Sequence, residues 1–498
     1  AGAPMGSDKD RVQELALAIA KKSEKFFATL KHHDIPIPVA DRLLRLCGVP
    51  RLHFLSRVSL FGEYSNAFEF FDAHVETTAA HQAGRPSAQE PGTTAESLQS
   101  SLPLRHAGFA FRNYSRNLAP ISNWAALAAV ATRLLDRCQG TLPRMFGISI
   151  RDSASFLRLL IPDELARDVL PPAGASAEDC LSFYANRHVE KLQRKLSRGV
   201  EDSQSFSRLL DGTPLTAARI KSCQAPWASA WLSDPFTEDR IEPEVHAAAC
   251  KLRLGAPLRP TAPKRCHCGV DLTTDPWHVL VHKGHLAAQR RHDCIVDVLM
   301  KWVTKVGGLA YEEPREEPGP NSSRRRTDIK IFLGPTAYSV DVGVTHPTAH
   351  YNIHHAARAP LGAADSYAKH KTRRYSAQAE REGATFVPFI VETFGGFCKQ
   401  ASDLVKAIAN YARLNSTVWT SAATVTGIRT EIHAELFAGN LQIANYELSR
   451  SHSRPTVFGR GRQPRPPRRQ QGGRTTTTAA NSSSNSSSNS SSSSSSSS

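Results

Sequence analysis

Residues 324–347, "RRRTDIKIFLGPTAYSVDVGVTHP", carry the clearest structural pattern in the sequence. Two runs in it, 327–332 and 337–344, are rich in β-branched and aromatic residues, and a Leu-Gly-Pro-Thr segment separates them. This pattern predicts a β-hairpin whose turn is centred between Gly334 and Pro335. Because proline fits the commonest two-residue turns poorly, we expect a longer loop with the same centre.

A hairpin with this centre pairs two acidic residues, Asp328 and Asp341, across its strands. Like charges directly opposite one another destabilise a sheet, and an acid inside an apolar strand pattern needs a compensating partner. A divalent cation between the carboxylates is such a partner, since Mg²⁺ and Mn²⁺ bind hard oxygen ligands. A cation of this kind activates water and neutralises charge on a phosphate, so the pair indicates the site of a hydrolytic phosphodiesterase.

Other charged residues are candidates to complete this site. The segment "LAYEEPREEP" offers Glu313 as a third acid, with Glu312 as the less favoured choice. The segment "YAKHKTRRY" offers Lys371, with Tyr375 one helical turn later, as a group that stabilises the transition state, and Lys369 is the alternative. The competing interpretation is a solvated α/β surface on which these charge runs only maintain solubility.

A Cys/His cluster, "CHCGVDLTTDPWHVLVHKGH", precedes the hairpin. Cys266 and Cys268 lie at a tight turn, and the four-residue spacing of His278 and His282 predicts that both project from one helix face. Two thiolates and two imidazoles form a closed tetrahedral Zn²⁺ set, which is structural because it leaves no open position for a reacting water. His285 is a rival for His282, and the alternative is a surface segment that is rich in histidine.

Composition limits the partners. The net charge of +16 and the pI near 9.6 favour a polyanion, usually nucleic acid. No apolar run reaches the roughly 20 residues that span a bilayer, since the longest candidate, 124–135, contains Arg133. We therefore expect no membrane partner. Nine scattered cysteines favour a reducing compartment, and the first residues show no secretory signal.

Changes in composition and hydrophobic periodicity along the chain predict a mixed architecture. An α-helical N-terminal half is followed by a Cys/His knuckle, an α/β domain with the order helix, strands, helix, strand, helix, and a disordered tail. The expected segments are 1–80 helical, 81–101 linker, 102–262 mostly helical, 263–290 knuckle, 291–412 α/β domain, 413–449 helical extension and 450–498 an Arg/Ser/Thr/Asn-rich tail.

From Cys266 to about Ala409 the sequence resembles the restriction-like endonuclease part of non-LTR retrotransposon reverse transcriptases. The matching features are the Cys-x-Cys-Gly…His…His knuckle, "RRHDCIVDVL", the acidic "YEEP", "RTDIKI" and "YSVDVGVTHP", then "KHKTRRY" and "FVPFIVETFGG" in the expected order. Upstream, "GAPMGS" is similar to the end of a polymerase palm, "LLRLCGVPRLHFLSRV" and "FEFFD" to the thumb that follows, and "LPLRHAGFAF" to a connector.

The resemblance implies a PD-(D/E)xK nuclease fold, with Asp328 and Asp341 as metal ligands and Lys371 as the catalytic lysine. Two departures stand out. The family usually has Cys where this chain has His282, and imidazole is an acceptable substitute. Ordinary nucleases of this fold carry the lysine two residues after the second acid, where this chain has Gly343, so Lys371 must reach in from the next helix.

We expect a metal-dependent DNA endonuclease that nicks double-stranded target DNA to prime reverse transcription, with element RNA as a further candidate partner. The alternative is a non-catalytic nucleic-acid-binding retroelement fragment or relic. The chain lacks a Tyr-x-Asp-Asp polymerase motif and an initiating Met, so we expect a fragment of a longer product that does not polymerise DNA. The expected location is the nucleus, and the sequence leaves the oligomeric state open.

Overall fold

The predicted hairpin forms with the predicted register. In the computed structural model β2 (Ile329–Leu333) and β3 (Thr336–Thr345) are antiparallel, and Leu333 pairs with Thr336, so the loop has only two residues. The expectation of a longer loop is wrong. Gly334 has φ +61°, and a turn with positive φ at its first central position leaves the second position free for the fixed negative φ of Pro335.

The structure describes residues 3–4 and 8–452, except 59–61, 63, 86–93, 139–143, 188–189, 203–209, 211, 234–240, 283–285, 313–326 and 416–417. The expected tail, 450–498, therefore lies outside the described residues from position 453 onward.

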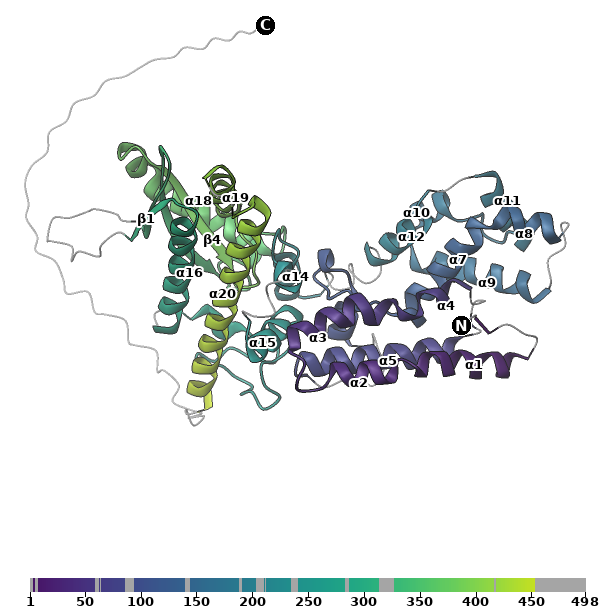
Figure 1. Ribbon diagram of the computed structural model, residues 1–498. Helices are drawn as coiled ribbons and strands as arrows, with labels where there is room; N and C mark the ends of the chain where they lie inside the picture. The colour runs from purple at the N-terminus through teal and green to yellow at the C-terminus, as the bar shows by residue number, and fades with distance from the viewer. Residues whose placement is uncertain are drawn as a thin grey trace, which may run out of the picture. The chain divides into compact units, whose positions relative to one another are not determined.

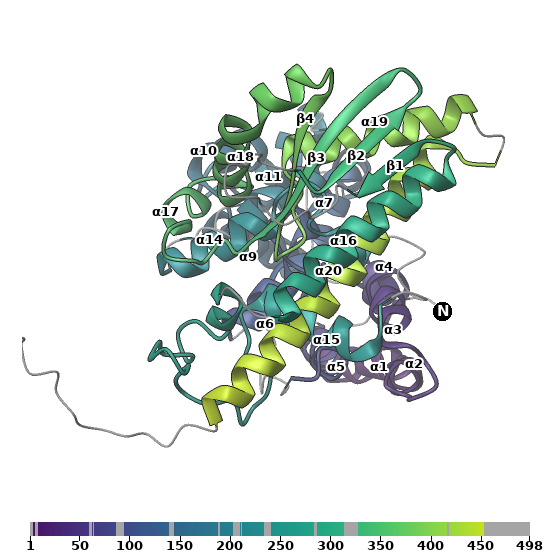
Figure 2. The same cartoon turned by 90° about the vertical axis from the view of Figure 1, so that its left-hand side faces the viewer.

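The hairpin is the centre of a mixed sheet in the order β1-β2-β3-β4. On one side β1 (Leu309–Glu312) runs antiparallel to β2, and on the other β4 (Thr385–Glu392) runs parallel to β3. A parallel pair needs a crossover connection, and here the crossover holds α17 (Ile353–Ala356) and α18 (Gly362–Arg381). Figure 2 shows the four strands side by side, with α18 near β4.

Helices α16 (Leu286–Lys305) and α19 (Lys399–Asn415) pack against this sheet, and α20 (Ser421–His452) packs against both of these helices. On α16 the residues Ile295, Leu299 and Trp302 are fully buried, at the spacing that places side chains on one helix face. Figure 1 shows α16 and α20 lying alongside one another. The predicted helices and strands of the α/β region are thus confirmed as elements.

The rest of the described chain is helical. The helices are α1 (Lys9–Lys21), α2 (Glu24–Leu30), α3 (Ile37–Leu43), α4 (His53–Val58), α5 (Ser65–Gln82), α6 (Ala95–Ser101), α7 (Ala119–Ala129), α8 (Ala131–Cys138), α9 (Arg144–Leu160), α10 (Asp163–Val169), α11 (Ala177–Asn186), α12 (Leu192–Val200), α14 (Pro214–Cys223) and α15 (Pro243–Leu254). Shorter π or 3-10 turns are η1 (Leu44–Gly48), η2 (Val49–Leu52), η3 (Leu104–His106), η4 (Tyr114–Leu118), η6 (Ala230–Leu232) and η8 (His278–Val281).

Part of the expected linker, 81–101, is helical. The Thr94 side chain accepts a hydrogen bond from the backbone N–H of Ser97 and so begins α6, whose residues Ser97 and Gln99 are buried. The linker prediction is wrong there because Ser and Thr, which suggested a loop, also cap helices. Residues 86–93 lie outside the described part of the chain.

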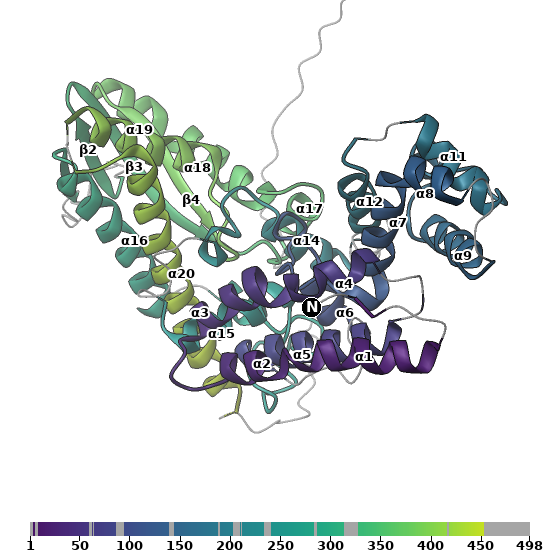
Figure 3. The same cartoon turned by 45° about the vertical axis from the view of Figure 1, so that its right-hand side comes forward.

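Two hydrophobic cores account for most of the described burial. One contains residues between Val12 and Ala119 together with residues between Ile220 and Leu448, so the N-terminal helices and the sheet region share it. The second contains residues between Ile121 and Val200, from α7 to α12. Figure 3 gives the clearest view of this second group of helices.

No single helix in the described ranges is long and apolar enough to cross a membrane. The paired helical segments Tyr114–Ala129 and Ala131–Cys138, bent by 64°, pass the same length and composition test together.

A buried glutamate fixes the start of α18. Glu392, at the end of β4, accepts a 3.0 Å hydrogen bond at Oε1 from the backbone N–H of Ala364, and Oε2 accepts a hydrogen bond from the hydroxyl of Ser222 on α14. The carboxyl is fully buried, and this burial raises the pKa of Glu392 to about 7. The contact joins β4, α14 and α18.

This glutamate makes stability depend on pH. The folded protein holds the proton at pH values where the unfolded chain, with the ordinary glutamate pKa of 4.5, has released it, so the free energy of unfolding falls as pH rises from about 4.5 to about 7. Glu392→Gln can keep both hydrogen bonds without a charge. We expect its stability to exceed that of the parent at pH 8 but not at pH 4.5, by roughly 3 kcal/mol at most.

Urea unfolding at pH 4.5 and pH 8 measures this difference. Glu380→Gln, at an exposed position on α18, is the matched control and is expected to show no such pH-dependent gain. An equal effect of Glu392→Gln at both pH values contradicts the prediction.

Candidate functional site

The two predicted acidic residues lie in one cleft, but they are not a regular cross-strand pair. The β2–β3 ladder ends at Ile329, which pairs with Val340, and Asp328 lies in a bend just before it. The backbone N–H of Asp328 donates to the carbonyl of Val340 at 2.9 Å, which shifts the register by one residue. The predicted direct pairing of Asp328 with Asp341 is therefore wrong. Like charges held directly opposite one another repel, and the one-residue register shift relieves this repulsion.

Lys371 reaches Asp341 from α18. Its Nζ lies 2.7 Å from Oδ2 of Asp341, whose side chain is only 5% exposed. The same ammonium lies 5.3 Å from the ring centre of Tyr367 and 5.6 Å from that of Tyr375. The alternative, Lys369, is exposed on α18. The structure thus places Lys371 beside Asp341 and Tyr375 beside Lys371.

Gly343 explains why the lysine comes from a helix. A Cβ atom at position 343 would lie 2.8 Å from Cε1 of Tyr367 and 2.8 Å from Cδ1 of Ile390, closer than real Cβ atoms approach other groups. A side chain two residues after Asp341 would therefore require Tyr367 or Ile390 to shift. The space beside β3 is filled by Tyr367, and the ammonium comes from α18 instead.

His292 belongs to the same site, and the sequence analysis missed it. It lies on α16, with Nε2 3.2 Å from Oδ2 of Asp328 and Nδ1 3.0 Å from Oδ1 of Asp293. The same Oδ2 accepts a 2.7 Å hydrogen bond from the backbone N–H of Val342. Helical spacing is the sequence signal that could have found it, because His292 lies three residues before Ile295. Ile295 is fully buried, and His292 lies at the edge of the buried stripe of α16.

The charged groups of the cleft shift one another's pKa values. Burial raises the pKa of Asp341, and the charge of Asp328 adds to this, while Lys371 opposes it. Burial alone would lower the pKa of Lys371, but the hydrogen bond to Asp341 raises it overall. Burial would likewise lower the pKa of His292, but its hydrogen bonds to Asp328 and Asp293 raise it. Lys371 therefore offsets part of the cost of burying the Asp341 carboxylate, while neighbouring carboxylates favour the charged forms of Lys371 and His292.

The donor set fits a divalent cation. In the described part of the chain, His292 and the backbone N–H of Val342 contact Oδ2 of Asp328. Lys371 contacts Oδ2 of Asp341. This leaves the Oδ1 atoms of Asp328 and Asp341 as hard oxygen ligands of the kind that Mg²⁺ and Mn²⁺ take. Both acids line a cleft of about 730 Å³, which also contains His292 and Lys371.

The third predicted acid is not placed. Glu313 lies outside the described residues, while Glu312, its less favoured alternative, is an exposed residue at the end of β1.

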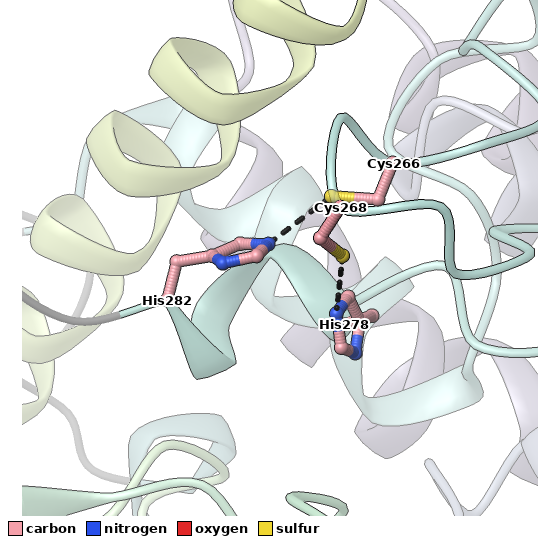
Figure 4. Close-up of side chains that lie close together, drawn as sticks. All are labelled: Cys266, Cys268, His278 and His282. Atoms are coloured by element: carbon pink, nitrogen blue, oxygen red, sulfur yellow. Dashed lines mark hydrogen bonds between the residues drawn. The ribbon is translucent and has the colours of Figure 1, made fainter. Parts of the chain in front are cut away.

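The Cys/His cluster comes together as predicted. Sγ of Cys266 lies 3.1 Å from Nε2 of His282, and Sγ of Cys268 lies 3.2 Å from Nε2 of His278. One ligand atom from each of the four residues lies within 4.8 Å of the others, so the group could hold a metal ion. Figure 4 shows the two thiols and the two imidazoles turned toward one another.

The backbone of this cluster differs from the expected helix. His278 begins the 3-10 turn η8, and His282 follows it in extended conformation. The prediction of two histidines on one helix face is wrong because four residues form only one tight turn here, and the extended residue turns its imidazole to Cys266. His285, the rival ligand, lies outside the described residues. Burial lowers the pKa of His278, which favours the neutral imidazole that a metal needs.

A contact from α20 supports the cluster. Nδ1 of His267 lies 3.0 Å from Oε2 of Glu447, and the backbone N–H of His267 donates to the hydroxyl of Ser451 at 3.0 Å. His267, His282 and Glu447 form a second group that could hold a metal ion. Because His282 belongs to both groups, the two cannot each bind a separate ion through the same nitrogen atom.

Comparison with curated proteins finds a similarity to a retrotransposon protein. A part of the chain is 28% identical over 197 residues to the Retrotransposable element SLACS 132 kDa protein of Trypanosoma brucei gambiense. This similarity supports a retrotransposon-related protein. The match covers 38% of this chain and 16% of the relative, so the chain spans only a small part of the relative's length. No family model matches the chain.

Proposed function

We propose that the chain is the metal-dependent DNA endonuclease part of a non-LTR retrotransposon protein and nicks double-stranded target DNA. The observation that carries this proposal is the ammonium of Lys371 at 2.7 Å from the buried Asp341, in a cleft that also contains Asp328. An acid pair can hold a divalent cation that activates water, and a lysine beside it can stabilise charge that develops on a phosphodiester. The similarity to a retrotransposon protein supports the same context.

The chain's own groups have distinct roles in this mechanism. Asp328 and Asp341 would hold Mg²⁺ or Mn²⁺, which would supply positive charge and a polarised water. Lys371 donates a hydrogen bond to the phosphate as negative charge builds on it. His292 and the N–H of Val342 hold the carboxylate of Asp328 through Oδ2. In the same proposal the Cys/His cluster binds Zn²⁺ and has a structural role, since all four positions are taken by protein.

Nicking of supercoiled plasmid tests this function. The purified chain is expected to convert plasmid to nicked circles with Mg²⁺ or Mn²⁺ but not with EDTA, and Asp341→Ala is expected to lose this conversion. Asp403→Ala, an exposed acid on α19, is the matched control and should nick like the parent.

Two outcomes contradict the proposal. A folded, zinc-loaded protein that binds the plasmid and leaves it intact would favour the non-catalytic binding fragment. Equal nicking by Asp341→Ala and the parent would place the activity elsewhere.

A further inference from the structure

A second cleft, larger than that of the acid pair, lies among the N-terminal helices. It has a volume of about 1060 Å³ and shares no lining residue with the cleft of Asp341. Its walls come from α4, α7 and α12, which lie side by side in Figures 1 and 3. We refer to it as the α12 groove.

Positive charge dominates the α12 groove. Six arginines and one lysine line it, against two glutamates. One of these acids, Glu201, lies 3.0 Å from Arg112 and is also paired with Arg105, so it is already shared between two guanidinium groups. Arg57, Arg194 and Arg198 are exposed, and no carboxylate of the described residues lies within ion-pair distance of them.

The beginning of α12 adds partial positive charge. Lys191, the N-cap, Leu192, Gln193 and Arg194 all line the groove, so the first turn of α12, with the partial positive charge of a helix N-terminus, forms part of its wall. No side chain caps this helix, and Lys191 has φ +55°, a conformation that is uncommon for a residue with a side chain. Helix N-termini that are uncapped by protein are ready-made sites for phosphate groups.

The lining of the groove suits a chain of phosphates. Alanines of α7, including the exposed Ala129, line it together with the arginines. Small-molecule pockets are mostly apolar with few polar groups, whereas this groove has cationic side chains on several elements. Burial lowers the pKa of His53 beside it, and the charges of Arg57 and Arg112 lower it further, as expected in a positive field.

We propose that the α12 groove binds the phosphodiester backbone of a nucleic acid, at a second site separate from the acid pair. The ligand chemistry is a run of phosphates, which single-stranded RNA and duplex DNA both supply. This proposal goes beyond the nuclease function, because the groove would hold nucleic acid whether or not the acid pair cuts it.

Salt-dependent binding tests the groove without any need for cleavage. The full chain in an Asp341→Ala background is titrated against a labelled single-stranded RNA and a labelled DNA duplex at several KCl concentrations. Arg57→Gln, Arg194→Gln and Arg198→Gln are combined in one variant. Each lost phosphate contact makes the slope of log K against log[salt] shallower by about 0.9 for duplex DNA and about 0.7 for single strands. We expect a change of about 2 to 3 with one or both ligands.

The matched control removes the same charge elsewhere. Lys21, Lys22 and Lys25 are exposed on α1, at its C-cap and on α2, and their combined change to Gln is expected to leave the slope nearly unchanged. Ala129→Glu, at an exposed position of the groove wall, places a carboxylate among the arginines and is expected to weaken binding at least tenfold in low salt.

Comparison of the RNA and the DNA duplex shows which nucleic acid binds in the α12 groove. A slope change only with RNA assigns the groove to RNA, and a change only with the duplex assigns it to DNA. If the triple arginine variant and Ala129→Glu both bind the two ligands with the slope and affinity of the lysine control, the proposal is wrong. Because no nicking is measured, this failure is independent of any failure of the nuclease function.

Discussion

Lys371→Ala is expected to lower the plasmid-nicking rate by about 10²- to 10³-fold, the usual loss when one preorganised group that stabilises transition-state charge is removed. The reason is the position of its Nζ, 2.7 Å from Asp341 and close to the rings of Tyr367 and Tyr375, inside the cleft of the acid pair. Lys369→Ala removes the same charge from an exposed position on the same helix and is expected to change the rate less than threefold.

The double variant Asp341→Ala/Lys371→Ala sharpens this test. Groups that act as one unit have strongly non-additive effects, so the double variant should nick at about the rate of the slower single variant. Thermal unfolding of each variant shows whether the fold is retained. Additive losses, or a loss with Lys369→Ala equal to that with Lys371→Ala, would show that Lys371 is not part of the reacting group.

Removal of any one ligand of the Cys/His cluster is expected to release zinc and lower the melting temperature. The variants Cys266→Ala, Cys268→Ala, His278→Ala and His282→Ala each break a set whose ligand atoms lie within 4.8 Å of one another. Zinc bound by comparable sets contributes about 10 kcal/mol or more of binding free energy, so chelation of zinc should destabilise the parent strongly. Metal content per chain and thermal unfolding with and without a chelator measure both effects.

Two variants serve as controls for the zinc prediction. Cys47→Ala changes an exposed thiol outside the cluster and is expected to keep the metal content and melting temperature of the parent. His267→Ala removes a residue of the second group, which contains His282 and Glu447. It is expected to keep zinc, and loss of zinc from this variant would assign His267 rather than His278 or Cys268 to the metal.

The elements around the site were predictable because their signals are local. The runs on either side of Gly334 and Pro335 fixed the β2–β3 register, which holds from Leu333 to Ile329. The helical spacing of α16, α18 and α19 likewise gave those helices. Periodicity within a segment of ten to twenty residues is sufficient for such predictions.

The details of the site were less predictable because they depend on residues far apart in the chain. The bend at Asp328 depends on one hydrogen bond to Val340 that no pattern encodes. His292 meets Asp328 only after α16 packs on the sheet. The hydrogen bond between Ser222 and Glu392 joins residues 170 positions apart, which single-sequence periodicity cannot detect.

The lack of space at Gly343 has a consequence for finding related sequences. A pattern that requires a lysine two residues after the second acid would pass over this chain, which has Gly343 there with Tyr367 packed close to its Cα. A search for proteins of this kind should ask for a glycine on the strand and a lysine with neighbouring tyrosines on the next long helix. Chains that such patterns have left out as inactive deserve a second inspection at that helix.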